Sequence, residues 1–103
     1  MKHEKIELVH GSGNVFRDFG YANADVEQLK AILATEIAKM LDRKKLTVRA
    51  AHALTGIAAA DFSRIRNADL RRFTLDRLMS ILNRLGTRVD VQISLRPIES
   101  AVA

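Results

Sequence analysis

Apolar residues recur at every third or fourth position between Asn23 and Lys45, which predicts one long amphipathic helix. Asn23 is a suitable N-cap, and Asp25 and Glu27 stand near the positive end of the helix dipole. The cations from Arg43 onward suit its negative end. The apolar stripe consists of Val26, Leu29, Leu33, Ile37 and Met40.

Two short helices separated by a glycine are expected next. The Thr47 hydroxyl can cap the first, which extends to about Leu54 and is ended by Gly56. The second extends from about Ala59 to Asn67.

A further helix is expected between Thr74 and Gly86. Thr74 is a good N-cap, Phe73 and Leu78 can pack across it as a hydrophobic staple, and Gly86 supplies the C-terminal stop. The apolar face of this helix is Leu75, Leu78, Leu82 and Leu85.

The hydrophobic period then falls to two, from Val89 to Leu95, and Pro97 ends the run. This alternation predicts a half-buried β-strand, which needs a partner for its backbone groups. Residues 5–9 alternate weakly and could supply that partner, or the equivalent strand of a second protomer could.

A chain of 103 residues, 48% of them hydrophobic, is long enough for one globular core but not for two. We divide it into an N-terminal arm (1–22) with a turn at 11–14, a helical domain (23–86), and a C-terminal strand and tail (87–103). There is no cysteine, and neither a secretory leader nor a membrane span is expected. The sequence therefore predicts a cytoplasmic protein with no membrane partner.

Basic residues are concentrated in one segment of the chain. Residues 43–88 contain eleven of the 17 basic residues and three of the 12 acidic ones, so this segment is strongly positive and the remainder mildly negative. Such a distribution is typical of a nucleic-acid footprint, although a solvated basic face without a partner would show it too.

Residues 46–67 have the spacing of a helix-turn-helix. Small residues at 50, 51 and 53 let two short helices approach closely, and Gly56 takes the turn. Ile57, Phe62 and Ile65 fill the angle at which the helices cross. The outer side of the second helix, which can meet base edges, is then Ala59, Ala60, Ser63, Arg64 and Arg66.

The succession of Leu46-Thr47, small residues, Gly56-Ile57 and an apolar-Ser-Arg-apolar helix resembles the phage repressor/Cro-like (XRE) helix-turn-helix family over about residues 28–86. The resemblance implies a mainly α fold, a lambda-repressor-like bundle of four to five helices, here followed by the C-terminal β-strand. Residues 11–16 and 60–66 look like one subgroup, the HigA-like antitoxins of type II toxin–antitoxin operons. Its members pair with a small RelE-like ribonuclease toxin and repress their own operon as dimers.

Two positions depart from the family pattern. The family usually has a small residue four positions before the turn glycine, but this chain has His52 there. Its side chain either lies in the crossing angle or rotates the first helix slightly. The start of the second helix holds alanines at 58–60 in place of Ser or Thr and long polar residues. Methyl groups can touch a thymine methyl but donate no hydrogen bond, so base reading falls on Arg64 with help from Ser63.

Further basic side chains are expected to hold the DNA backbone rather than read bases. Asn67 fits either a phosphate contact or a helix cap, and the cap is favoured. Asp61 stabilises the first helical turn, or pairs with Arg64 or Arg49. The phosphate contacts are assigned to Arg49, Arg66, Arg71 and Arg72, so the complete predicted DNA-binding set is Arg49, Ala59, Ala60, Ser63, Arg64, Arg66, Asn67, Arg71 and Arg72.

Catalysis, metals and cofactors are not expected. His3, His10 and His52 lack metal-ligand spacing, and residues 11–13 lack the Gly-Lys-Ser/Thr ending of a phosphate loop. The sequence instead predicts an autorepressing antitoxin that binds double-stranded operator DNA as a homodimer and also binds a toxin, with the arm (1–22) as the favoured toxin surface. The alternatives are a plain repressor of the same fold and an interaction module that no longer binds DNA.

Overall fold

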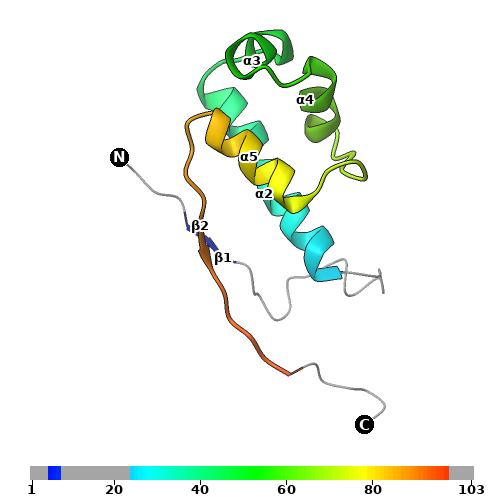
Figure 1. Ribbon diagram of the computed structural model, residues 1–103, viewed down its shortest axis with the longest axis vertical. Helices are drawn as coiled ribbons and strands as arrows, with labels where there is room; N and C mark the ends of the chain where they lie inside the picture. Colours follow the sequence, from blue (N-terminus) through cyan, green and yellow to red (C-terminus); the bar gives the residue numbers. More distant parts are fainter. Residues whose placement is uncertain (1–4, 8–23, 98–103) are drawn as a thin grey trace.

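The computed structural model describes residues 5–7 and 24–97, which form four helices and two short strands (Figure 1). In chain order these are β1 (Lys5–Glu7), α2 (Ala24–Arg43), α3 (Val48–Thr55), α4 (Ala59–Arg66), α5 (Leu75–Arg84) and β2 (Asp90–Gln92). The mainly α fold expected from the sequence is confirmed, with its four helical segments. The turn expected at 11–14 and the Asn23 cap lie outside the described residues. Among those described, no helix combines the length and the apolar character needed to cross a membrane.

Helix α2 packs against α4 and α5, and its buried residues lie between its middle and its C-terminal end. The expected apolar stripe was therefore partly wrong: Val26 is exposed, and Leu41 rather than Met40 is fully buried. Figure 1 shows the N-terminal end of α2 extending beyond α5, and the first buried residue of α2 is Leu33. The buried residues of α2 are Leu33, Ala34, Ile37 and Leu41.

The core is closed by the last two helices and the residues between them. Phe62 of α4 is fully buried, and Phe73 and Leu78 are buried on either side of the Thr74 cap as the hydrophobic staple requires. On α5 the buried face includes Ile81, which the sequence pattern missed, whereas Leu75 is only partly buried. Since Ile81 and Leu82 are neighbours in sequence, this face is wider than the single row of leucines that the periodicity suggested.

Helix ends follow the local sequence closely. The Thr47 hydroxyl accepts a hydrogen bond from the Ala50 amide at 3.0 Å, and the Thr74 hydroxyl accepts one from the Arg77 amide at 3.3 Å. Both bonds satisfy an amide that would otherwise have no partner in the first helical turn. Gly56 ends α3 with φ = +78°, a left-handed conformation that costs glycine little because it has no Cβ.

The two strands form a parallel pair in which Lys5 is opposite Asp90 and Glu7 is opposite Gln92. Two partners were expected for the C-terminal strand, and the one found within this chain is a strand of the N-terminal arm, β1. The strand itself is shorter than expected, since residues 93–97 continue without a partner strand among the described residues. The expectation of a half-buried strand was also wrong, because Val91, Ile93 and Leu95 are exposed.

Candidate nucleic-acid interface

Helices α3 and α4 form the helix-turn-helix, and side chains hold the turn between them. The Ile57 amide donates to the Thr55 hydroxyl at 3.1 Å, and the Gly56 amide donates to the His52 carbonyl at 2.8 Å. From α5, Nη1 of Arg84 donates to the Thr55 carbonyl at 3.2 Å. The angle between the two helices is thus fixed by local bonds and by a contact from a third helix.

His52 lies in the last turn of α3, and its side chain reaches across the turn rather than into the crossing angle. Its side chain is exposed, and Nδ1 stands 2.9 Å from the Ile57 carbonyl oxygen. A carbonyl oxygen only accepts, so Nδ1 must carry the proton and donate. The preceding residue, Ala51, is the fully buried small residue that permits the close approach of α3 and α4. The departure from the family pattern therefore adds a bond across the turn without opening the helix crossing.

The outer face of α4 follows from its buried face. Phe62 and Ile65 point into the core. With 3.6 residues per turn, the positions farthest from them are Ala60, Ser63 and Arg64, together with the C-cap residue Asn67. These four lie at i, i+3, i+4 and i+7, which is the spacing of one continuous helical stripe. Ala59 lies at the flank of this stripe and is partly buried.

Arg64 is held by a carboxylate on its own helix. Its Nη1 donates to Oδ1 of Asp61 at 2.7 Å, and Nη2 of Arg77 on α5 donates to Oδ2 of the same carboxylate at 3.2 Å. Asp61 was expected to pair with Arg64 or Arg49, and the pair with Arg64 is present. The Arg77 contact was missed, because sixteen residues separate it from Asp61 and only the packing of α5 beside α4 brings them together.

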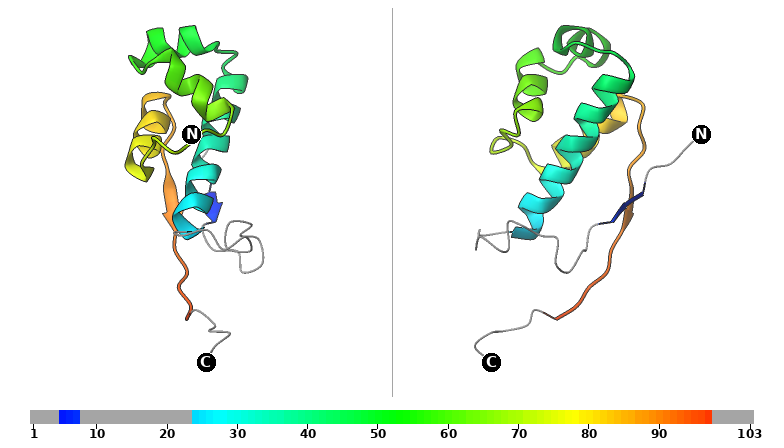
Figure 2. Two further views of the ribbon diagram at one scale, coloured as in Figure 1. Left: turned by 90° about the vertical axis from the view of Figure 1, so that its right-hand side faces the viewer. Right: turned by 180° about the vertical axis from the view of Figure 1, so that it is seen from behind.

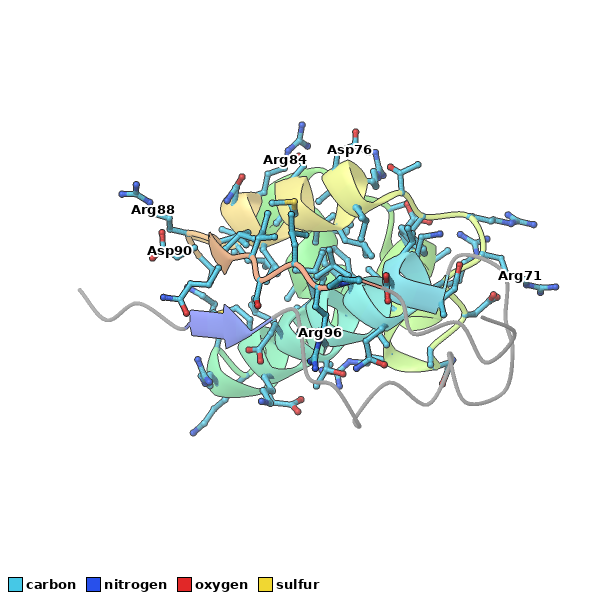
Figure 3. All side chains as sticks on the ribbon, turned by 90° about the horizontal axis from the view of Figure 1, so that it is seen from below. Arg71, Asp76, Arg84, Arg88, Asp90 and Arg96 are labelled. Carbon is cyan, nitrogen blue, oxygen red and sulfur yellow. The ribbon has the colours of Figure 1, made fainter. Side chains whose placement is uncertain are left out.

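The remaining residues of the predicted DNA-binding set differ in whether their side chains contact other parts of the protein. Arg66 turns toward the end of α2, where Nη2 lies 3.0 Å from Oδ1 of Asp42. Arg71 is 92% exposed, with Nε 3.5 Å from Oδ1 of Asp69, and projects away from the helices (Figure 3). Arg49, in the first turn of α3, and Arg72, beside Arg71, are exposed. Arg49, Arg71 and Arg72 are therefore exposed cations beside α4, whereas the guanidinium of Arg66, although also exposed, is paired with Asp42 of α2.

The loop after α4 that carries Arg71 and Arg72 is closely tied to the helix end. The Asp69 amide donates to the Arg64 carbonyl at 2.8 Å and the Ala68 amide donates to the Ile65 carbonyl at 3.1 Å, which is the bonding of a Schellman motif. Ala68 occupies its left-handed position, with φ = +58°.

Within the residues that the structure describes, no group of three His, Asp or Glu side chains could hold a metal ion.

Comparison with known proteins identifies this architecture. The profile of a family described as "Helix-turn-helix domain" matches residues 15–94. A solved structure described as an XRE family transcriptional regulator has 35% sequence identity to this chain, with a TM-score of 0.66, and the match covers 80% of this chain and 92% of the other. None of the curated proteins compared with the chain matches it. The chain belongs to the helix-turn-helix domain family, and within it to the XRE type.

Proposed function

We propose that this protein is a sequence-specific DNA-binding transcriptional regulator in which α4 enters the major groove. The observation that carries the proposal is the outer stripe of α4, where Ala60, Ser63 and Arg64 lie opposite the buried residues of the same helix. A helix with one face packed and the other bearing a guanidinium, a hydroxyl and a methyl group can present all three to base edges. The similarity to an XRE family transcriptional regulator supports it.

In this proposal only a few side chains contact the bases. Arg64 would donate two hydrogen bonds to O6 and N7 of a guanine, Ser63 would assist, and Ala59 and Ala60 would contact thymine methyl groups. Arg49, Arg71 and Arg72 would contact phosphates, which position the protein but carry no sequence information. Asn67 would lie at the end of the outer stripe of α4, and Arg66, paired with Asp42, would lie at the edge of this surface.

We also propose that the protein binds its operator as a homodimer. One eight-residue helix meets few base pairs, whereas two related by a two-fold axis would meet half-sites about 34 Å apart and roughly double the contacts. Light scattering at micromolar concentration tests this, and a monomer would contradict it.

The finer role we propose is that of an autorepressing antitoxin for a RelE-like toxin, with a plain XRE repressor as the alternative. The support is the resemblance of residues 11–16 and 60–66 to HigA-like antitoxins. The gene next to this one decides between them, since an antitoxin requires a small basic ribonuclease as its neighbour. Co-purification of the two products would support the antitoxin role.

DNA binding is tested by gel shift with the DNA upstream of the gene, against random DNA of equal length, at moderate salt. A specific regulator is expected to prefer its operator by about 10³-fold or more. Equal affinity for both DNAs would contradict the proposal.

A further inference from the structure

An apolar row lies exposed on the segment that follows α5. Val91, Ile93 and Leu95 are 41%, 70% and 88% exposed, and they share one face because side chains alternate along an extended chain. Residues 93–97 have no partner strand among the described residues. Figure 2 shows this segment continuing past the end of α2. Unpaired backbone groups beside an apolar row are a template for another strand.

We propose that the strand which pairs here is the same segment of a second copy of this chain, antiparallel and related by a two-fold axis at Ile93. This inference rests on the homodimer of the proposed function and assigns its contact. Directly opposite residues in an antiparallel pair project to the same face. A two-fold axis through a residue therefore places apolar against apolar, whereas an axis between two residues would place apolar against polar.

Charge selects among the axes that satisfy this rule. With the axis at Ile93, Asp90 is opposite the partner's Arg96, Gln92 is opposite the partner's Ser94, and Val91 is opposite the partner's Leu95. The two-fold axis makes the Asp90–Arg96 pairing occur twice. Every apolar residue of the row is then covered by another apolar residue, and both charged positions meet the opposite charge.

The neighbouring axes are worse. An axis at Gln92 places Arg88 opposite the partner's Arg96, and like charges directly opposite destabilise a strand pair. An axis at Ser94 places Arg96 opposite the partner's Gln92, so the pairing of Asp90 with Arg96 is lost.

The existing sheet also favours this partner. β1 and β2 pair over only three residues each, and an isolated two-stranded sheet is marginal in water. β1 occupies one edge of β2, so a second copy at the other edge would join two such pairs into four strands in the order β1–β2–β2–β1. Asp90 already lies 3.5 Å from Nε of Arg88, its neighbour in Figure 3, but a carboxylate can accept from two guanidinium groups, as Asp61 does here.

The register is tested by cysteine cross-linking, since the chain contains no cysteine. In Ile93→Cys the two thiols would face each other with Cα atoms about 4.5–5.5 Å apart, within the range of a disulfide. In the control Ser94→Cys they would be diagonal, about 7–8 Å apart, which a disulfide bridges poorly. Mild oxidation is expected to link most of Ile93→Cys and little of Ser94→Cys, and to link Gln92→Cys with Ser94→Cys when the two are mixed. Equal linking of Ile93→Cys and Ser94→Cys would overturn the register.

The charge pairing is tested by reversal, with dimer dissociation measured by sedimentation. Asp90→Lys is expected to raise the dimer Kd about tenfold, because two favourable pairs become like-charge pairs. The double variant Asp90→Lys/Arg96→Asp is expected to restore it. Arg88→Gln removes one neighbour of Asp90 within the same chain and is expected to change the Kd little. A double variant no better than Asp90→Lys would overturn the pairing, and circular dichroism would show that each variant is folded.

These measurements need no DNA, so the two proposals can fail separately. A dimer that does not cross-link at residue 93 would overturn the strand contact and leave DNA binding untouched. A cross-linked dimer without preference for the upstream DNA would support the contact and contradict the proposed function. A chain that stays monomeric throughout the series would overturn the contact.

Discussion

Arg64 donates a 2.7 Å hydrogen bond to Asp61, one turn earlier on the same helix. Asp61 accepts a second bond from Arg77 of α5, so one carboxylate holds two guanidinium groups beside the outer face of α4. Its side chain is 21% exposed, and those of Arg64 and Arg77 are 32% and 50% exposed. Arg64, which we propose reads DNA, is therefore held in a defined position before binding. To contact a base edge, its guanidinium must give up the hydrogen bond to the Asp61 carboxylate.

Replacing Arg64 with Ala is expected to weaken operator binding by about 1–3 kcal/mol and to relax preference at one base pair, because a forked contact to guanine is lost. Binding to random DNA should change much less. Fluorescence anisotropy with a set of single-base operator variants measures both effects. Arg64→Lys is the matched variant, since it retains the charge but not the fork. Equal losses on operator and random DNA would contradict the reading role.

Asp61→Asn is expected to strengthen binding to random DNA. The change removes a negative charge that faces the DNA in this proposal and frees Arg64 and Arg77 to contact phosphates. The slope of log K against log salt should become steeper by about one unit for each added phosphate contact. Glu36→Gln on α2, where Glu36 pairs with Lys39 at 3.3 Å, makes the same charge change away from α4 and is the control. The prediction is wrong if both variants strengthen binding alike.

Arg71→Ala or Arg72→Ala is expected to weaken operator and random DNA by the same factor and to reduce the salt slope by about one unit, because a phosphate contact carries no sequence information. Titrations of both DNAs at several salt concentrations measure this. Lys39→Ala, an exposed cation on α2, is the control and should change binding less. A loss confined to the operator would mean that these arginines read bases.

Ala68→Gly is expected to stabilise the protein by about 0.5–1 kcal/mol, since Ala68 has φ = +58° and glycine adopts the left-handed conformation without strain. The reverse change, Gly56→Ala at the C-terminal end of α3, should destabilise the protein by about 1 kcal/mol. An added Cβ at Gly56 meets no atom within 4 Å, so this loss reports conformational strain and not a clash. Urea unfolding of both variants measures the free energies, and a destabilised Ala68→Gly would refute the explanation.

Asp76 gives the stability of the protein an acid dependence. A hydrogen bond from the Thr74 hydroxyl holds the pKa of Asp76 below its ordinary value of 3.8. A carboxyl whose pKa is lower in the folded state stabilises that state above pH 3.8, and the contribution disappears as the pH falls through the lower, folded pKa. Asp76→Asn should therefore flatten the decrease in unfolding free energy below about pH 4. Urea titrations across this range test it, and an unchanged curve would contradict it.

Helix positions followed from the sequence because their causes are local. Thr47, Gly56 and Thr74 act within one turn of their own backbone, and each marks a helix end where expected. Ala51, Phe62 and Ile65 occupy the buried side of the helix-turn-helix because the spacing of that motif determines which side chains face inward. Ala60, Ser63 and Arg64 lie on the outer stripe of α4 for the same reason. Ala59 and Arg66, also expected there, do not: Ala59 is partly buried and Arg66 turns toward Asp42.

Contacts between distant parts of the chain could not be obtained in this way. The Arg77–Asp61 and Arg66–Asp42 bonds join different helices, and they depend on how α5 and α2 pack beside α4. Only the tertiary structure shows that β1 pairs with β2, and that the row from Val91 to Leu95 is exposed, although its alternation suggested a half-buried strand. Periodicity establishes which side chains share a face, but burial of that face depends on what packs against it. The sequence alone therefore determined the helix-turn-helix and offered the Asp61–Arg64 pair, because both depend on spacing within one helix or one turn. The packing of the whole chain decided that Arg77 joins Asp61 and which surfaces remain open, because these depend on how distant elements pack.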